Sequence, residues 1–231
     1  MEQALNIARR IQDKPNEKRM LAWQAWIAHL DGDLHRAAFI FDQAEKLENE
    51  LTSGIYLYNL YGIQHADHLR RILFSNYARA ITDTNLQYCE RNQWTFLVSQ
   101  CHRVLGDLDS DSGDHDSARG HYDFALKIAR SIQKRNVLIE ILLARGRWAA
   151  KHTKDSNAAF ADLNEALDYC AKSGYRIYEA DVRVALAWAY LANDENQKAK
   201  ESAERALQMS QEMGYHWGKV DAEEVLKAMS G

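Results

Sequence analysis

The chain of 231 residues has few of the residues that interrupt helices, with one proline (Pro15) and 11 glycines. Proline and glycine are the residues that most often end a helix or form a turn. Hydrophobic residues make up 46% and charged residues 27% of the chain, which is ordinary for a globular protein. The composition therefore predicts long helices joined by short turns, in a chain long enough to bury a substantial core.

Features that mark other protein classes are also missing. The net charge is −4 and the isoelectric point about 6.1, so no basic excess indicates nucleic-acid binding. No stretch of 18 apolar residues free of charges occurs, and the N-terminus lacks the apolar run of a secretion signal. We therefore expect a soluble, cytoplasmic protein that binds neither nucleic acid nor a membrane.

The three cysteines, Cys89, Cys101 and Cys170, are far apart and lie inside helical patterns. Because no CxxC pair occurs, neither a zinc knuckle nor a redox motif is predicted. Free thiols inside helices fit a reducing compartment, where cysteine behaves as a small hydrophobic residue.

A self-comparison of the sequence indicates a repeated helix. The segments 118–126, 159–167 and 199–207 share an alanine, a large or small apolar residue four positions later, and Ala-Leu at positions seven and eight. Related patterns begin at Ala37 and Leu73, which gives intervals of 36, 45, 41 and 40 residues. This spacing forms one stripe of an α-helix, and its small residues let a neighbouring helix approach closely.

A second amphipathic segment precedes each of these helices, at 17–30, 55–68, 93–107, 137–151 and 176–192. Turn residues form the breaks DGD (31–33), DSDSGD (109–114), TKDSN (153–157) and NDEN (193–196). Gly174 and Gly214 are expected to end second helices in the left-handed conformation. Each repeat is therefore predicted to be a helix hairpin, and the stacked hairpins a right-handed all-α solenoid.

The predicted organisation is a single repeat domain over 1–231. It comprises a half-unit at 2–13, units at about 17–53, 54–92, 93–135, 136–174 and 175–214, and a terminal helix at 215–229. The segment ALNIARRI (4–11) nearly duplicates ALKIARSI (125–132), so the array begins in the middle of a repeat. We expect either a short protein with an unusual cap or a fragment of a longer chain.

At this level the sequence resembles the tetratricopeptide repeat family over essentially its whole length. The unit at 99–133 matches signature positions of that family with Leu105, Gly106, Gly113, Ala118, Tyr122 and Ala125. Asp109 stands where the family has an aromatic residue, which Tyr190 supplies in the unit at 180–213. The signature proline near the end of the second helix is missing throughout.

The ending Gly-Tyr-x-x-x-x-x-Asp, at 174–181 and 214–221, and the segment 57–72 resemble a narrower group. These are the repeats that follow the nucleotide-binding modules of bacterial signal-transduction ATPases of the STAND class. The resemblance implies a sensor array that controls an attached effector. Neither GxxxxGK[ST] nor GxGxxG after a strand occurs, so an ATPase would lie elsewhere in the parent protein.

The resemblance also implies that the first helices of the hairpins line a concave groove. Their register predicts binding residues at Trp23, Trp26, Tyr58, Asn59, His65, Arg103, Glu140, Arg147, Asp181 and Trp188, with Asp107 beside them. Tryptophan and arginine are common at binding hot spots. The alternative for Trp23 and Trp26 is packing between hairpins. For Arg103 and Arg147 the alternative is ion pairing with Asp107 or Glu140.

The mixture of aromatic residues and both charges in this groove favours a protein or peptide segment as partner. Family members that bind chaperone tails use a Lys/Asn/Arg carboxylate clamp. The corresponding positions hold Ala22, Trp23, Trp26 and Asn59, of which only Asn59 matches, so that partner class is not expected. Two alternatives remain. One is a small-ligand or signalling-peptide receptor, and the other is a scaffold that self-assembles through its end helices, at Leu5, Val225 and Leu226.

No pattern in the sequence predicts catalysis, a cofactor or a metal. His65 and His68 have HxxH spacing, but no third ligand accompanies them. The segment 109–116 resembles a calcium loop, yet Asp114 and Gly120 occupy the positions where an EF-hand needs Gly and Glu. No GxSxG or Cys-His signature occurs. We therefore expect an interaction module and not an enzyme.

Overall fold

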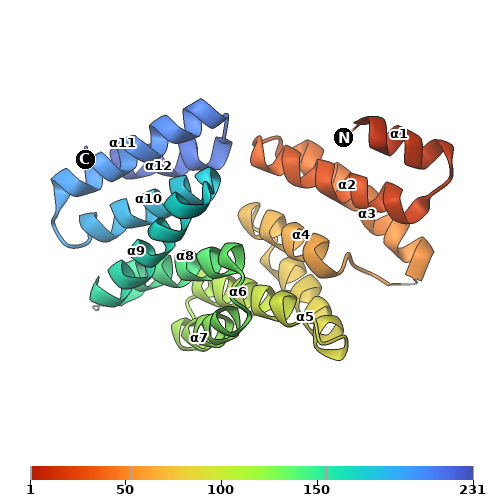
Figure 1. Ribbon diagram of the computed structural model, residues 1–231, viewed down its shortest axis with the longest axis horizontal. Helices are drawn as coiled ribbons and strands as arrows, with labels where there is room; N and C mark the ends of the chain where they lie inside the picture. The colour runs from red at the N-terminus through yellow and green to blue at the C-terminus, as the bar shows by residue number, and fades with distance from the viewer. Residues whose placement is uncertain (1, 53, 154–155, 231) are drawn as a thin grey trace. The chain divides into compact units, whose positions relative to one another are not determined.

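Twelve α-helices and no strand make up the computed structural model within the residues that it describes, 2–52, 54–153 and 156–230 (Figure 1). The predicted all-α class is therefore confirmed. No described helix is at once long and apolar enough to cross a membrane. In chain order the helices are α1 (Glu2–Arg10), α2 (Lys14–Leu30), α3 (Leu34–Thr52), α4 (Asn59–Arg71), α5 (Ser75–Arg91), α6 (Thr95–Ser112), α7 (His115–Ile132), α8 (Arg135–His152), α9 (Ser156–Ser173), α10 (Arg176–Leu191), α11 (Asn196–Met213) and α12 (His216–Ala228).

Local sequence explains where several helices begin and end. Asp13 caps α2 by accepting a hydrogen bond from the Asn16 amide at 3.1 Å, and Pro15 lies in the first turn, where the missing amide hydrogen is not needed. Gly174 and Gly214 follow α9 and α11 with φ values of +70° and +67°. The predicted left-handed stops are therefore confirmed.

The predicted turn at 109–114 is wrong for most of its length, because α6 continues through Ser112. The Ser112 hydroxyl donates a hydrogen bond to the Asp109 carbonyl at 2.9 Å and satisfies one acceptor of the last helical turn. Gly113, with φ of +85°, then ends the helix, and Asp114 caps α7. The aspartates and serines at the end of α6 therefore led to a predicted turn that is longer than the turn the chain forms.

The small-residue stripe is buried as predicted in four of the second helices. Its first residues are Ala37 in α3, Ala118 in α7, Ala159 in α9 and Ala199 in α11, and none of them is exposed. These alanines leave room for the preceding helix at close range.

In α5 the predicted stripe is wrong. Leu73 lies in the turn before α5 and is 88% exposed, whereas Ala78 is the buried small residue. Thr82 and Asn85 take the positions four and seven residues later and are buried. The Thr82 hydroxyl donates to the Ala78 carbonyl at 2.7 Å, which satisfies it inside the core. With Ala78 as the start, the five stripes begin 41, 40, 41 and 40 residues apart.

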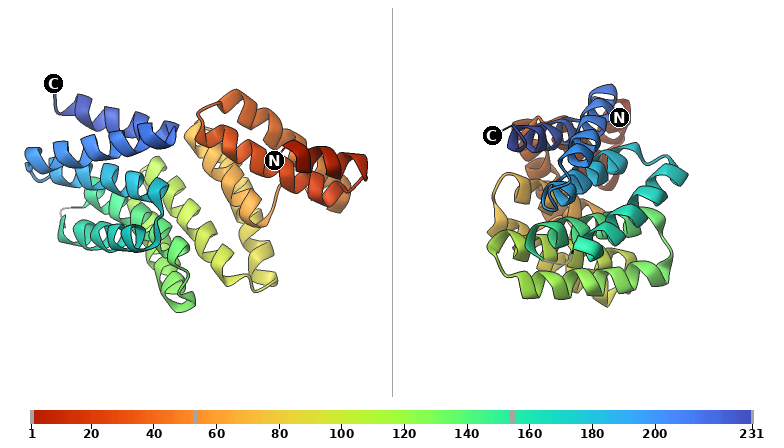
Figure 2. Two further views of the ribbon diagram at one scale, coloured as in Figure 1. Left: turned by 45° about the horizontal axis from the view of Figure 1, so that its top comes forward. Right: turned by 90° about the vertical axis from the view of Figure 1, so that its left-hand side faces the viewer.

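The chain divides into two compact units, unit 1 (residues 1–108) and unit 2 (residues 109–231). In unit 1, α2 packs on α3 and α4 on α5, while α1 and α4 also contact α2. In unit 2, α8 packs on α9, α10 on α11, and α10 also contacts both α8 and α12 (Figure 2). Within each unit, consecutive helices therefore pack as neighbours, which is consistent with a helical repeat solenoid.

Close packing of α8 on α9 depends on Gly146. A Cβ atom at this position would lie 2.7 Å from Cγ of Leu163, which is fully buried. Only a glycine lets the two helices approach to this distance without displacing that side chain.

Two hairpins have an ion pair at equivalent positions, between a cation at the start of the first helix and a glutamate near the end of the second. Lys14 Nζ lies 3.0 Å from Glu50 Oε2 between α2 and α3, and Arg176 Nη2 lies 2.6 Å from Glu212 Oε2 between α10 and α11. Each charge alone has the sign that the helix dipole disfavours at that end. The pairing therefore offsets an unfavourable charge at both helix ends.

Candidate functional site

Arg103, predicted to line the groove, is buried and bound within unit 1. Its guanidinium donates to the Asp67 carboxylate of α4 at 2.6 and 3.0 Å, in a two-pronged ion pair. It also donates to Asp107 at 3.0 Å and to Gln100 at 2.8 Å. The ion pair with Asp107 was the predicted alternative to ligand binding, and it is present. Arg103 thus joins α6 to α4.

Asn59 and Tyr58 also make contacts inside unit 1. Asn59 has φ of +56°, and its amide donates to Asn85 Oδ1 at 2.7 Å, while Asn85 Nδ2 donates back to the Asn59 carbonyl at 2.8 Å. This pair of bonds fixes the start of α4. The Tyr58 ring lies 4.7 Å from the ring of Tyr88 and 6.4 Å from that of Trp94.

The two tryptophans of α2 pack against aromatic neighbours. Trp23 meets Tyr61 edge to face at a centroid distance of 6.3 Å, and Trp26 stacks on His29 at 4.8 Å. Trp26 also packs against the apolar core of unit 1. The predicted alternative of packing between hairpins describes the contact of Trp23 with Tyr61 of α4, whereas the stacking of Trp26 on His29 lies within α2.

His65 is buried between α4 and α3. Its ring stacks on Phe41 at 4.4 Å, and its Nδ1 lies 3.2 Å from Glu45 Oε1. The His68 ring also packs against Phe41, at a centroid distance of 5.4 Å, and its Nδ1 lies 3.2 Å from His29 Nδ1. Burial, and secondarily the charge of His65, lowers the pKa of His68 to about 4. No group of three or more metal-ligating side chains occurs among the described residues.

In unit 2, tyrosine hydroxyls connect three first helices in succession. The Tyr178 hydroxyl of α10 donates to the Glu140 carboxylate of α8. The Tyr215 hydroxyl, at the start of α12, donates to Asp181 Oδ2 of α10 at 3.3 Å. Two predicted site residues, Glu140 and Asp181, are therefore held by tyrosines from the next first helix.

We call the surface formed by Glu140, Arg147, Tyr178, Asp181 and Tyr215 the α8–α10–α12 face. Burial raises the pKa of Tyr215 well above its usual value, and the nearby Asp181 carboxylate raises it further. The positive charge of Arg147 acts in the opposite direction. The Tyr215 hydroxyl therefore keeps its proton and acts as a donor on this face.

Arg147 differs from Arg103 because it forms no ion pair with any residue in the described part of the chain. Its side chain is half-buried on α8, so the predicted alternative of pairing with Glu140 is not formed. A charge in such a position is less screened than one in open solvent. The remaining predicted residue, Trp188, packs against the apolar core of unit 2 around Val184 and Ala222.

Sequence reasoning missed Tyr178 and did not assign a role to Tyr215. Tyr215 belongs to the repeated Gly-Tyr ending, which was a usable signal, whereas Tyr178 has no counterpart in that motif. The end-helix residues Leu5 and Val225 lie buried in the cores of their own units, and Leu226 packs beside Val225. Their substitution would therefore disturb folding before it tested self-assembly.

No protein-family model matches the chain, and no curated protein matches it.

Proposed function

We propose that the chain is an interaction module of the tetratricopeptide type, which binds a peptide or protein segment at the α8–α10–α12 face. In this proposal the helices form a right-handed solenoid of about five hairpins with a half-unit at each end. The observation that carries the proposal is that Arg147 is a half-buried residue and forms no ion pair with the described residues.

The repeat pattern supports the family assignment. Buried small residues recur at intervals of 41, 40, 41 and 40 residues in α3, α5, α7, α9 and α11. Each of these helices follows a first helix in the chain, as the hairpin repeats of this family require. A regular interval of this kind places equivalent residues of successive hairpins next to one another.

The chemistry of the face supports a peptide carrying a carboxylate. Arg147 offers a planar set of donors that suits a carboxylate, and its partial burial strengthens a charged hydrogen bond. Asp181 and Glu140 have already accepted hydrogen bonds from Tyr215 and Tyr178. An acidic side chain or a C-terminal carboxylate of the partner would thus form an ion pair with Arg147 on this face.

The resemblance to arrays of STAND-class ATPases supports a sensor role. In this proposal the segment bound at the face changes the curvature of the array and thereby the activity of an attached effector. Solenoids transmit such changes because each repeat contacts only its neighbours.

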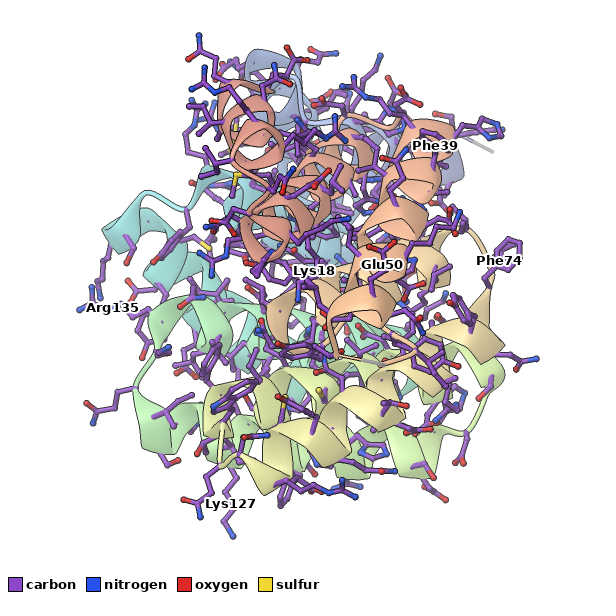
Figure 3. The ribbon with its side chains drawn as sticks, turned by 90° about the vertical axis from the view of Figure 1, so that its right-hand side faces the viewer. Lys18, Phe39, Glu50, Phe74, Lys127 and Arg135 are labelled. Atoms are coloured by element: carbon purple, nitrogen blue, oxygen red, sulfur yellow. The ribbon has the colours of Figure 1, made fainter. Side chains whose placement is uncertain are left out.

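Affinity capture from a lysate of the source cells tests the proposal, with the native chain and Arg147→Ala as baits. Synthetic segments of a captured protein are then titrated against both baits by fluorescence anisotropy. Arg135→Ala is the matched control, because it removes the same group from the exposed first turn of the same helix (Figure 3).

Loss of a charged hydrogen bond should weaken binding by about tenfold or more in Arg147→Ala, while Arg135→Ala stays within about twofold of the native chain. Equal affinity of the native chain and Arg147→Ala for every captured segment would refute binding at this face.

A further inference from the structure

A pocket of about 570 Å³ opens in unit 1 where α3, α4 and the start of α5 meet. Its walls are largely apolar and include Leu34 and Ala38 of α3, Leu69 of α4, Ile72, and Phe74. Pockets that bind small organic molecules have volumes of about 300–1,000 Å³ and mostly apolar walls with a few placed polar groups. Both the volume and the walls therefore fit a small ligand.

The main polar group of this pocket is the carboxylate of Glu45. Its Oε2 accepts a hydrogen bond from the Tyr77 hydroxyl at 2.8 Å. Its Oε1 faces His65 Nδ1 at 3.2 Å and the Leu57 amide at 3.4 Å. A carboxylate has about four acceptor positions. These contacts fix the orientation of the Glu45 carboxylate and leave capacity for one further donor.

Tyr77 serves as a donor to Glu45 and not as a charged group. Burial, and next the hydrogen bond to Glu45, raises the pKa of Tyr77. The hydroxyl therefore keeps its proton, and the negative charge of the pair stays on Glu45.

Asp42 adds a second carboxylate one turn earlier on α3. Its Oδ2 lies 2.5 Å from Lys46 Nζ, but both side chains of this ion pair are exposed, so water screens it. A ligand cation can therefore compete with Lys46 for Asp42. Among the described residues that line the pocket there are two carboxylates and no lysine or arginine.

The mouth of the pocket carries exposed apolar side chains. Phe74, directly before α5, is 59% exposed at the surface (Figure 3) and is one of the residues that line the pocket. Leu73 before it has φ of +66°, and this left-handed residue turns the chain from α4 into α5. Aromatic rings beside a pair of carboxylates suit an organic cation, whose charge and hydrocarbon both find partners.

We propose that this pocket binds an organic ammonium or guanidinium ion carried on a short aromatic or aliphatic chain. The cation lies against Glu45 and Asp42, and the hydrocarbon lies against Leu69, Ile72 and Phe74. The pocket shares no residue with the α8–α10–α12 face. The two proposals therefore rest on different residues.

Three probes, two of them cations and one an anion, test this proposal on the full chain by two-dimensional NMR titration. 2-Phenylethylamine and 3-phenylpropionate carry the same ring on similar chains with opposite charges. Nα-acetyl-lysinamide carries the same cation with peptide groups attached. At about pH 8, ordinary histidines are neutral while the amines stay charged.

We expect 2-phenylethylamine to bind saturably with a Kd on the order of 1 mM or lower, and 3-phenylpropionate about tenfold more weakly. The amide shifts should map to α3, α4 and the start of α5. If Nα-acetyl-lysinamide binds more tightly than 2-phenylethylamine, the natural cation is assigned to a protein side chain. If it binds more weakly, the natural cation is assigned to a free amine. Either order supports cation binding in the pocket.

Two variants test the residues. Glu45→Gln removes the charge of the main acceptor, and Asp42→Asn does the same at an exposed position where folding is not at risk. Each substitution should raise the Kd for 2-phenylethylamine by about threefold to tenfold. Glu50→Gln, on the same helix but outside the pocket lining, should leave its Kd unchanged.

Three results would overturn the proposal: no saturable shift with the amine, equal affinity for the amine and the carboxylate, or an unchanged Kd in both Glu45→Gln and Asp42→Asn.

Discussion

Replacing Glu48 with leucine should destabilise the protein by far more than the same change at Glu50. Glu48 of α3 pairs with Lys18 of α2 at 2.6 Å, and the two side chains are 1% and 11% exposed. The Thr52 hydroxyl also donates to Glu48 Oε1 at 2.9 Å. Glu48→Leu would therefore leave the ammonium group of Lys18 buried without its carboxylate.

Removal of one partner of a buried ion pair costs about 3–5 kcal/mol, because the other charge loses both water and its partner. The Lys14–Glu50 pair joins the same two helices, with side chains that are 50% and 60% exposed. Exposed pairs of this kind contribute about 0–1 kcal/mol. The two glutamates are thus a matched comparison in which burial is the main difference.

Urea unfolding followed by far-UV circular dichroism gives the free energy of unfolding for each variant. We expect a loss of about 3–5 kcal/mol in Glu48→Leu and at most about 1 kcal/mol in Glu50→Leu. The double variant Lys18→Met, Glu48→Leu should recover most of the loss, because it removes both buried charges.

Equal losses in Glu48→Leu and Glu50→Leu would show that burial of the pair does not govern its contribution. A double variant less stable than Glu48→Leu alone would show that Lys18 is stabilised by groups other than Glu48.

Two further predictions concern close packing and acid. Gly146→Ala should lower the free energy of unfolding by about 1–3 kcal/mol, because the new Cβ would meet Leu163 at 2.7 Å. Gly120→Ala lies inside α7, where the new Cβ would meet no described atom within 4 Å other than its chain neighbours and the backbone of its own helix, and it should raise the free energy of unfolding by about 1 kcal/mol. A loss of stability there in urea unfolding would contradict this reasoning. Because the pKa of His68 falls from 6.5 to about 4 on folding, the unfolded chain takes up a proton first as the pH decreases. His68 therefore costs no stability above about pH 7.5, and the free energy of unfolding falls by about 2 kcal/mol between about pH 7.5 and pH 5. His68→Gln should flatten that slope in urea unfolding, and an unchanged slope would refute the assignment.

The helical class could be predicted because the chain lacks helix breakers and carries apolar stripes at helical spacing. The stripe in α5 could not be placed, because Thr82 and Asn85 look like surface residues in the sequence. Both are buried through hydrogen bonds, from Thr82 to the Ala78 carbonyl and between Asn85 and Asn59. A polar side chain with a partner in the backbone can thus replace an alanine in such a stripe.

The candidate site was less predictable than the fold. The sequence indicated which residues lie on first helices, but it did not show which partners they meet. Arg103 pairs with Asp67, 36 residues earlier, and Glu140 accepts a bond from Tyr178, 38 residues later. Such contacts depend on which turns of two helices face each other, which hydrophobic periodicity alone does not specify.

The ion pairs Lys14–Glu50 and Arg176–Glu212 affect how a chain of helix hairpins can gain or lose a hairpin. Both charges of each pair lie within a single hairpin. A gene duplication or deletion that covers the whole hairpin therefore copies or removes the cation together with its carboxylate. The number of hairpins can change in evolution without leaving either charge alone at a helix end where the dipole opposes it.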